Sequence, residues 1–329
     1  MPNLLTRAAS RSRVAPHIGV QPRAVLWITA LAGILALASA SAGLFWRDDG
    51  DPFSFTTLHG QTVEIAGEGL YRNDTVFSAA AFRGTDVVTL GVVLPLLVIS
   101  AWLVWRGSLR GAFLLTGTLS FVLYNGASMA LGAAYNPLFL VYVALFSSSL
   151  FAFGLAFRAI NRSDLLAHLA PGLPRRTLAI FMIVAGVVTA LVWLSDIIGA
   201  LVAGQAPALL GPYTTKVTYA LDIAIITPLA VLGGLLIWRH IALGYAIAFP
   251  IILLCALVGV MVIAQTIMQL MAGIVFHPVQ AIVFIGSWLA LSLFAAWLLL
   301  SFLRHVRDAP LAVAERWSRH HSGRQAGYS

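Results

Sequence analysis

Apolar residues form eight long stretches along the chain, separated by shorter polar segments. A helix needs about 20 mainly apolar residues to cross a bilayer, since each residue adds about 1.5 Å. The eight stretches lie at residues 24–45, 87–105, 111–132, 138–157, 178–203, 218–238, 241–271 and 281–303. The pattern predicts an all-α fold, a polytopic transmembrane bundle of about eight spanning helices over residues 24–303. The seventh stretch must tilt, bend near Pro250 or project from the bilayer, because it exceeds one straight crossing.

The sizeable polar segment, residues 46–85, follows the first predicted helix. Alternating side chains at Thr62–Ala66 predict one strand of a small hairpin. Asp74 is positioned to cap a short helix through Phe82 that would lie against the membrane surface. Asp86 stands at the start of the second apolar stretch, where it is interpreted as part of the N-cap, with its charge facing the positive end of the helix dipole.

Composition excludes a water-soluble globular protein. The chain of 329 residues is 60% hydrophobic and only 10% charged, and its mean hydropathy is +0.92. Soluble domains carry roughly 25% charged residues, so the bilayer is the expected solvent and partner of this chain. The net charge of +8 would suggest nucleic acid binding in a soluble protein. In a membrane protein, basic residues gather in cytoplasmic segments, so the charge predicts topology and no nucleic acid partner.

The basic residues predict the orientation of the helices. With the N-terminus in the cytoplasm, 16 of the 20 basic residues lie inside, and the four outside are Arg47, Arg72, Arg83 and Lys216. Both termini are then cytoplasmic, and the 46–85 loop is extracytoplasmic. Residues 1–23 and 304–329 become basic cytoplasmic segments, and residues 158–177 become a cytoplasmic linker. The expected location is a bacterial cytoplasmic membrane.

The first apolar stretch has a second interpretation. Ala38-Ser39-Ala40 resembles a signal-peptide cleavage site, and cleavage there would leave seven helices. The apolar run continues to Phe45 and exceeds the 7–15 residues that are usual for a signal core. A spanning helix is therefore the favoured interpretation.

The linker at residues 158–177 divides the predicted helices into four plus four. No convincing sequence repeat relates the two halves. The sequence therefore does not favour a transporter built from internal repeats.

Four short motifs carry a resemblance to known sequences: Leu70-Tyr71-Arg72-Asn73-Asp74, Arg83-Gly84-Thr85-Asp86, Tyr135-Asn136-Pro137-Leu138-Phe139 and Gly211-Pro212-Tyr213-Thr214-Thr215. With them, the chain resembles a group of uncharacterised bacterial multi-pass integral membrane proteins over about residues 55–300. The resemblance implies the membrane fold. That group has no assigned activity, so no functional residue can be transferred from it.

Two carboxylates within the apolar stretches are candidate site residues, because ionisable groups are costly inside a bilayer. Asp196 and Asp222 lie near the outer ends of two consecutive antiparallel helices, so they are expected at comparable depth. Polar side chains at a similar level extend the predicted site: Gln265, Gln269, Tyr124 and Asn125. Together they predict an outward-facing polar pocket for a small cation, a proton relay or a polar solute.

A purely structural interpretation of these residues stands beside the functional one. Asp196 and Asp222 could pair with basic residues at the membrane interface: Arg72, Arg83 or Lys216. Gln265 and Gln269 could serve as hydrogen-bonding contacts between helices.

No cofactor, metal ligand or catalytic residue is predicted. Cys255 is the single cysteine, which excludes an internal disulfide and a thiolate metal site. His240, His277 and His305 fall at helix ends, whereas a membrane haem needs paired histidines within helices. The motifs of nucleotide hydrolases, zinc proteases and nucleophile-elbow enzymes are missing from the sequence.

Three functional hypotheses follow. The first is transport of a small solute or ion through the Asp196 and Asp222 region. The second is a membrane sensor or assembly partner that recognises a ligand or a protein through the 46–85 loop. The third is an intramembrane enzyme acting on lipid-linked substrates, for which the sequence offers no recognisable set of catalytic residues.

Overall fold

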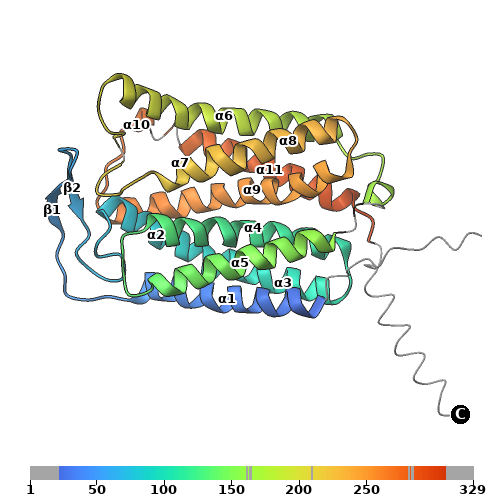
Figure 1. The fold of residues 1–329 in the computed structure, drawn as a ribbon, viewed down its shortest axis with the longest axis horizontal. Coiled ribbons are helices and arrows are strands. Elements are labelled where there is room, and N and C mark those ends of the chain that lie inside the picture. Colours follow the sequence, from blue (N-terminus) through green and yellow to red (C-terminus); the bar gives the residue numbers. More distant parts are fainter. Residues whose placement is uncertain are drawn as a thin grey trace, which may run out of the picture.

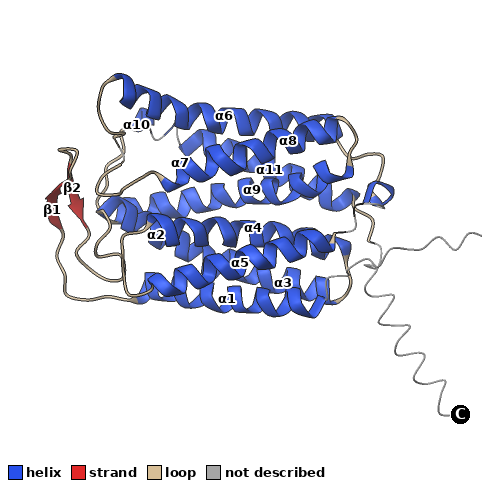
Figure 2. Cartoon of the chain, viewed as in Figure 1, coloured by secondary structure: helices blue, strands red, loops and turns tan. Residues whose placement is uncertain are grey.

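The computed structural model describes residues 22–160, 162, 165–208, 210–280, 282 and 285–308. Roughly parallel and antiparallel helices form one bundle, and a small β-hairpin projects from one end (Figures 1 and 2). We call that end of the bundle the hairpin end. The opposite end, where residues 22 and 308 lie, is the terminal end.

Eight helical spans within the described residues are long and apolar enough to cross a membrane. Six are single helices: α1 (Pro22–Phe45), α4 (Leu109–Gly132), α5 (Phe139–Ala159), α6 (Arg175–Val202), α9 (Ala242–Met271) and α11 (Gly286–His305). Two are composite: α2–η1–α3 (Val76–Val88, Thr89–Val93, Leu94–Trp105) and α7–η3–α8 (Val217–Leu221, Asp222–Ile226, Thr227–Trp238). The short helices η2 (Leu165–His168) and α10 (Pro278–Gln280) lie in connections. The predicted helical fold with eight spans of membrane-crossing length is confirmed, and α9 continues past Pro250 as one helix of 30 residues.

The hairpin is also confirmed. Strand β1 (Phe53–Thr56) pairs antiparallel with β2 (Thr62–Ile65), which overlaps the predicted strand. Gln61 joins the hairpin to the loop between α6 and α7. Its side-chain amide donates to the carbonyl of Pro207 at 3.1 Å, and its oxygen accepts from the backbone N–H of Gly211 at 3.0 Å.

The second span begins earlier than predicted. Helix α2 starts at Val76, and the Thr75 hydroxyl caps it by accepting from a backbone N–H. No separate surface helix follows Asp74, and Asp86 lies inside the helix rather than at its start. The reason is a buried partner: Tyr71 is fully buried and donates to the Asp86 carboxylate at 2.7 Å. With that donor, the carboxylate can be buried among helices without capping one.

The structure reveals a repeat that the sequence did not. The π-helical segments Thr89–Val93 and Asp222–Ile226 are each five residues long, and each is followed by a helix of 12 residues. Both following helices carry proline at their second position, Pro95 or Pro228. Proline cannot donate to the carbonyl four residues earlier, and the π-helical turn before it relieves that mismatch with bonds to the fifth residue.

The match continues beyond these helices. Each ends in Trp-Arg, followed by a residue with positive φ, Gly107 at 79° or His240 at 61°. The next helix then begins with a close approach at Gly111 or Gly244, where a Cβ would lie 2.5 Å from Leu103 or 2.6 Å from Ile237. These features occur in the same order and at the same spacing in both halves.

The two halves therefore share one structural plan. The first half contains α1 to α5 and the second α6 to α11. In each half the central helix, α4 or α9, packs on the helix before it and the helix after it, and α4 and α9 also pack on each other. Each half contains four spans, so both halves begin at the same end of the bundle and have the same orientation. Transporters whose repeats are related by an axis along the membrane normal share this arrangement. The halves differ at their first helices, because α1 packs on α5 whereas α6 packs on α8.

We expect Gly84→Ala to destabilise the contact between α2 and α9. A Cβ at Gly84 would lie 2.5 Å from the Cα of Gln265, and backbone cannot move aside as a side chain can. Overpacking of this kind costs about 1–3 kcal/mol, so the melting temperature in detergent should fall. Gly154→Ala on α5 is the control, since its Cβ would meet nothing within 4 Å. Equal melting temperatures for the two variants would contradict the expected close packing.

Candidate functional site

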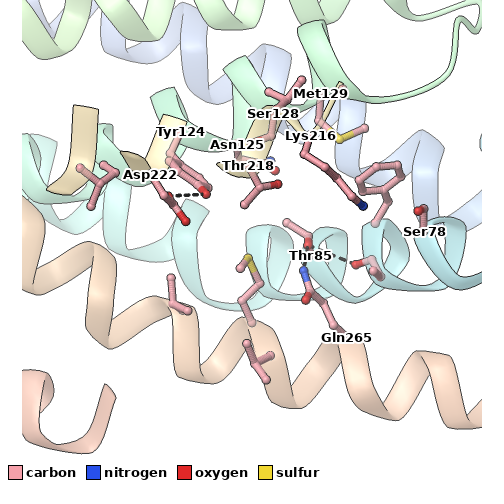
Figure 3. A pocket seen from close by; sticks show the side chains of 18 of the residues that line it. Ser78, Thr85, Tyr124, Asn125, Ser128, Met129, Lys216, Thr218, Asp222 and Gln265 are labelled. Carbon is pink, nitrogen blue, oxygen red and sulfur yellow. Dashed lines mark hydrogen bonds between the residues drawn. The ribbon is translucent and has the colours of Figure 1, made fainter. Parts of the chain in front are cut away.

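A cavity of about 330 Å³ extends from the hairpin end into the bundle. Helices of both halves line it: α2 and α4 from the first, and α6, α7–η3, α9 and α11 from the second. Its charged and polar lining residues include Ser78, Thr85, Tyr124, Asn125, Ser128, Tyr213, Lys216, Thr218, Asp222 and Gln265, many of which are seen in Figure 3. The remaining wall is largely apolar and includes Phe121, Leu254, Val258 and Met261. A pocket with apolar walls and a few convergent polar groups is typical of a small-molecule site.

Asp222 supplies the negative charge of the cavity. It is the first residue of η3, and its side chain is 7% exposed. One carboxylate oxygen accepts from the Tyr124 hydroxyl at 2.9 Å, and the other accepts from the Trp193 indole N–H at 2.8 Å. Both donors are neutral, so they orient the carboxylate without cancelling its charge.

Lys216 supplies the positive charge. It occupies the N-cap position of α7, and its side chain lines the cavity. Among the described residues it forms no ion pair. Burial lowers the pKa of Lys216 to about 8, and the charge of Asp196 opposes that shift. The ammonium therefore remains mostly protonated at neutral pH and is available to a ligand.

Aromatic rings separate Asp196 from Asp222. Trp193 stacks on Tyr219 at a centroid distance of 4.3 Å and on Trp288 at 6.3 Å. The Tyr219 hydroxyl donates to Asp196 at 2.9 Å. Asp222 lines the cavity, whereas Asp196 is not among its lining residues. Of the two predicted carboxylates, Asp222 therefore lies in the cavity wall, and Asp196 lies behind the aromatic rings.

Further polar side chains line the cavity beside the two charged ones. Gln265 donates to the Thr85 hydroxyl at 2.9 Å, which fixes both side chains at the contact between α2 and α9. The Oγ of Ser128 is buried and has no hydrogen-bond partner within the part of the chain that the structure describes. An unsatisfied buried hydroxyl costs free energy, so a ligand or a water that bonds to Ser128 would be stabilised.

The mouth of the cavity is tied together by Asp74. This residue is 1% exposed, and its carboxylate accepts from the backbone N–H of Ala134 at 2.9 Å and from the Tyr213 hydroxyl at 3.0 Å. Ala134 belongs to the first half and Tyr213 to the second. Burial raises the pKa of Asp74 to about 6, and it also raises the pKa of Tyr213 well above its ordinary value.

Toward the terminal end, aromatic packing closes the bundle. Phe113, Phe249 and Phe302 are each fully buried, and the ring centroids of each pair lie 5.2 Å apart. Phe249 precedes the cavity residues of α9, and Phe113 precedes those of α4. We call these three residues the phenylalanine plug. The cavity thus extends to exposed Thr215 at the hairpin end, and the phenylalanine plug lies beyond it toward the terminal end.

The predicted ion pairs take different partners. Arg72 pairs with Asp48 at 3.1 Å, and Arg83 pairs with Glu68 at 3.0 Å. The acidic residues of the loop lie nearest to these arginines, so neither reaches Asp196 or Asp222. Gln269 donates to the carbonyl of Phe77 at 3.3 Å and does not line the cavity. Tyr124, Asn125, Gln265 and Asp222 do line it, so four of the predicted pocket residues are brought together.

Trp193 and Trp288 were missed by the sequence analysis. Tryptophans near helix ends are usually membrane-interface anchors, yet both line the cavity. The available signal was the position of Trp193 one helical turn before Asp196, on a helix already carrying a candidate carboxylate.

Searches of protein-family models, curated proteins and solved structures find no match to this chain. Its function must be argued from the site itself.

Proposed function

We propose that this chain is a small-solute transporter of the bacterial cytoplasmic membrane, with its substrate site in the cavity between the two halves. One observation carries the proposal: a partly polar cavity lined by both halves of a structural repeat extends to exposed Thr215 at one end, and the phenylalanine plug packs the bundle toward the other end. That combination fits one state of an alternating-access cycle, in which the two halves rock about a central site.

The π-helical segments support movement between the halves. They occur at matching positions in the two composite spans, and Asp222 begins one of them. Such segments interrupt the regular bonding of a helix and recur at functional sites. A ligand contact at Asp222 would therefore act directly on the segment of α7–η3–α8 best able to change shape.

The distribution of arginine supports an orientation. The terminal end carries basic residues of the connections, among them Arg106, Arg158, Arg175, Arg239 and Arg307. Positive residues are retained on the cytoplasmic side. We therefore place the terminal end in the cytoplasm, and the cavity then faces the extracytoplasmic side.

A sensor is the second candidate, favoured by the hairpin. Gln61 bonds the hairpin to the loop that leads into Lys216, so an event at the hairpin would reach the cavity. In a sensor the solute would bind from the hairpin end and never cross.

Labelling of Cys255 separates these candidates. This single cysteine lines the cavity, so an impermeant methanethiosulfonate reagent reports which side has access. We expect labelling from the hairpin side in oriented vesicles, and slower labelling from the terminal side as the halves exchange conformations. Cys255→Ser is the control and should remain unlabelled. Labelling from the hairpin side alone would contradict transport and favour the sensor, and no labelling from either side would contradict an accessible cavity.

A further inference from the structure

The cavity presents two opposite charges at separate places. Lys216 precedes α7 and Asp222 follows it, so their Cα atoms are about 9 Å apart along the helix axis at the usual rise per residue. In Figure 3 the Lys216 ammonium and the Asp222 carboxylate lie on either side of Thr218. The two side chains are held apart by the helix that carries them.

Neither charge is neutralised by the chain. Asp222 has two neutral donors, and Lys216 forms no ion pair with any described residue. The charge of Asp196 acts on Lys216 electrostatically, but the hydrogen bond of Asp196 is to the Tyr219 hydroxyl. A charge removed from water and left without an opposite charge is costly. A ligand that brings an anion to Lys216 and a cation to Asp222 would remove both costs at once.

Resting on the proposed transport function, we infer that the solute is a zwitterion with its charges at opposite ends, a carboxylate that meets Lys216 and an ammonium that meets Asp222. Short peptides and ω-amino acids share this chemistry. An α-amino acid does not, because its ammonium and carboxylate groups are attached to the same carbon atom. An extended dipeptide spans about 7 Å, and a hydrogen bond of about 3 Å at each end extends its reach across the cavity.

The cavity wall between the charges fits the body of such a molecule. Phe121, Leu254 and Met261 offer apolar surface for a methylene chain or an aliphatic side chain. On the same wall, the buried Ser128 hydroxyl lacks a partner among the described residues and could bond to a peptide group. Both peptides and ω-amino acids would use the apolar surface. A hydrogen bond to Ser128 would distinguish them, because the chain of an ω-amino acid has no peptide group.

Protection of Cys255 from N-ethylmaleimide tests the inference on the purified full chain in lipid nanodiscs. The probes are Leu-Leu, 6-aminohexanoate, leucine, hexanoate and hexylamine. We expect Leu-Leu or 6-aminohexanoate to protect at concentrations about tenfold or more below those of the other three probes. Leucine lacks the separation between its charges, and hexanoate and hexylamine each lack one charge. Preference for Leu-Leu alone would identify a peptide site, and preference for 6-aminohexanoate alone an ω-amino acid site.

Two variants assign the charges. In Lys216→Gln, 6-aminohexanoate should protect no better than hexylamine, and in Asp222→Asn it should protect no better than hexanoate. Asp49→Asn is the matched control, because Asp49 is exposed in the loop after α1 and lies outside the cavity lining, and it should keep the preference of the parent chain. Unchanged preference in both cavity variants would overturn the assignment of Lys216 and Asp222.

The outcomes separate this inference from the proposed function. If singly charged probes or leucine protect as well as the terminal zwitterions, or if no probe protects while Cys255 still reacts, the inference fails and the accessible cavity remains. If N-ethylmaleimide does not reach Cys255 at all, both fail.

Discussion

Phe113→Ala is expected to lower the free energy of unfolding by about 2–4 kcal/mol. Phe113 is fully buried in the phenylalanine plug, where it contacts Phe249 and Phe302. Its removal leaves a void between α4, α9 and α11 that rigid helices cannot refill. The loss should fall somewhat below the roughly 3–5 kcal/mol of a water-soluble core, because lipid or detergent solvates the unfolded side chain. Denaturation by sodium dodecyl sulfate in mixed micelles measures the change.

Phe151→Ala is the matched control for this variant. Phe151 is on α5 and is 61% exposed, so it faces the surroundings of the bundle rather than another helix. Its substitution should change the free energy of unfolding by less than about 1 kcal/mol. Similar losses for Phe113→Ala and Phe151→Ala would show that the plug is not tightly packed.

Most span boundaries could be predicted from sequence because hydrophobic length alone determines a crossing. The first predicted span, 24–45, is observed as Arg23–Phe45, and the sixth, 218–238, as Val217–Trp238. Such agreement needs no knowledge of contacts, since only lipid, an environment shared by all the spans, sets the length.

The start of the second span was predicted wrongly because a side-chain contact, rather than hydrophobicity, decides where it begins. Asp86 was interpreted as a cap, because an isolated carboxylate is unfavourable inside an apolar helix. Its partner Tyr71 lies in the preceding loop, and no periodic pattern relates the two positions. Without knowledge of that hydrogen bond, the start of the second span at Val76 could not be derived from hydrophobicity.

The structural repeat was not recognised in the sequence for a related reason. Its two copies preserve backbone features, namely the π-helical turn, the positive φ after Trp-Arg and the close approach at Gly111 and Gly244. The residues that recur, a proline, a Trp-Arg pair and a glycine, are few and scattered, and at the positive φ the glycine of one half is replaced by His240 in the other. Lipid-facing positions accept any apolar residue, so little sequence identity is needed to keep the plan.

The candidate site was predicted in part because polar residues are rare in spans. Asp222, Tyr124, Asn125 and Gln265 were identified by that rarity, and all four line the cavity. Lys216 was assigned to the membrane surface, and only the fold shows that its side chain enters the same space as Asp222. The opposite charges of the cavity, on which the inferred ligand depends, are therefore a result of the tertiary structure.

Asp74, at the mouth of that cavity, should make the free energy of unfolding depend on pH. Its pKa is raised from 3.8 to about 6 by burial, so the folded protein holds a proton that the unfolded chain releases at lower pH. A raised carboxyl pKa gives stability that is fully present below pH 4 and is lost as the pH rises to about 6. The shift corresponds to about 3 kcal/mol, at about 1.4 kcal/mol for each pH unit.

Asp74→Asn should remove this dependence. Its amide oxygen can still accept from Ala134 and Tyr213, which join the two halves at the mouth, but the side chain no longer ionises. The variant should therefore match the parent chain near pH 4 and exceed its stability by up to about 3 kcal/mol at pH 7. Unfolding in mixed micelles between pH 4 and pH 7 gives the difference, with exposed Asp49→Asn as the control that keeps the parent profile. A variant less stable than the parent at pH 7 would mean that ionised Asp74 stabilises the mouth, the reverse of the sign derived from its burial.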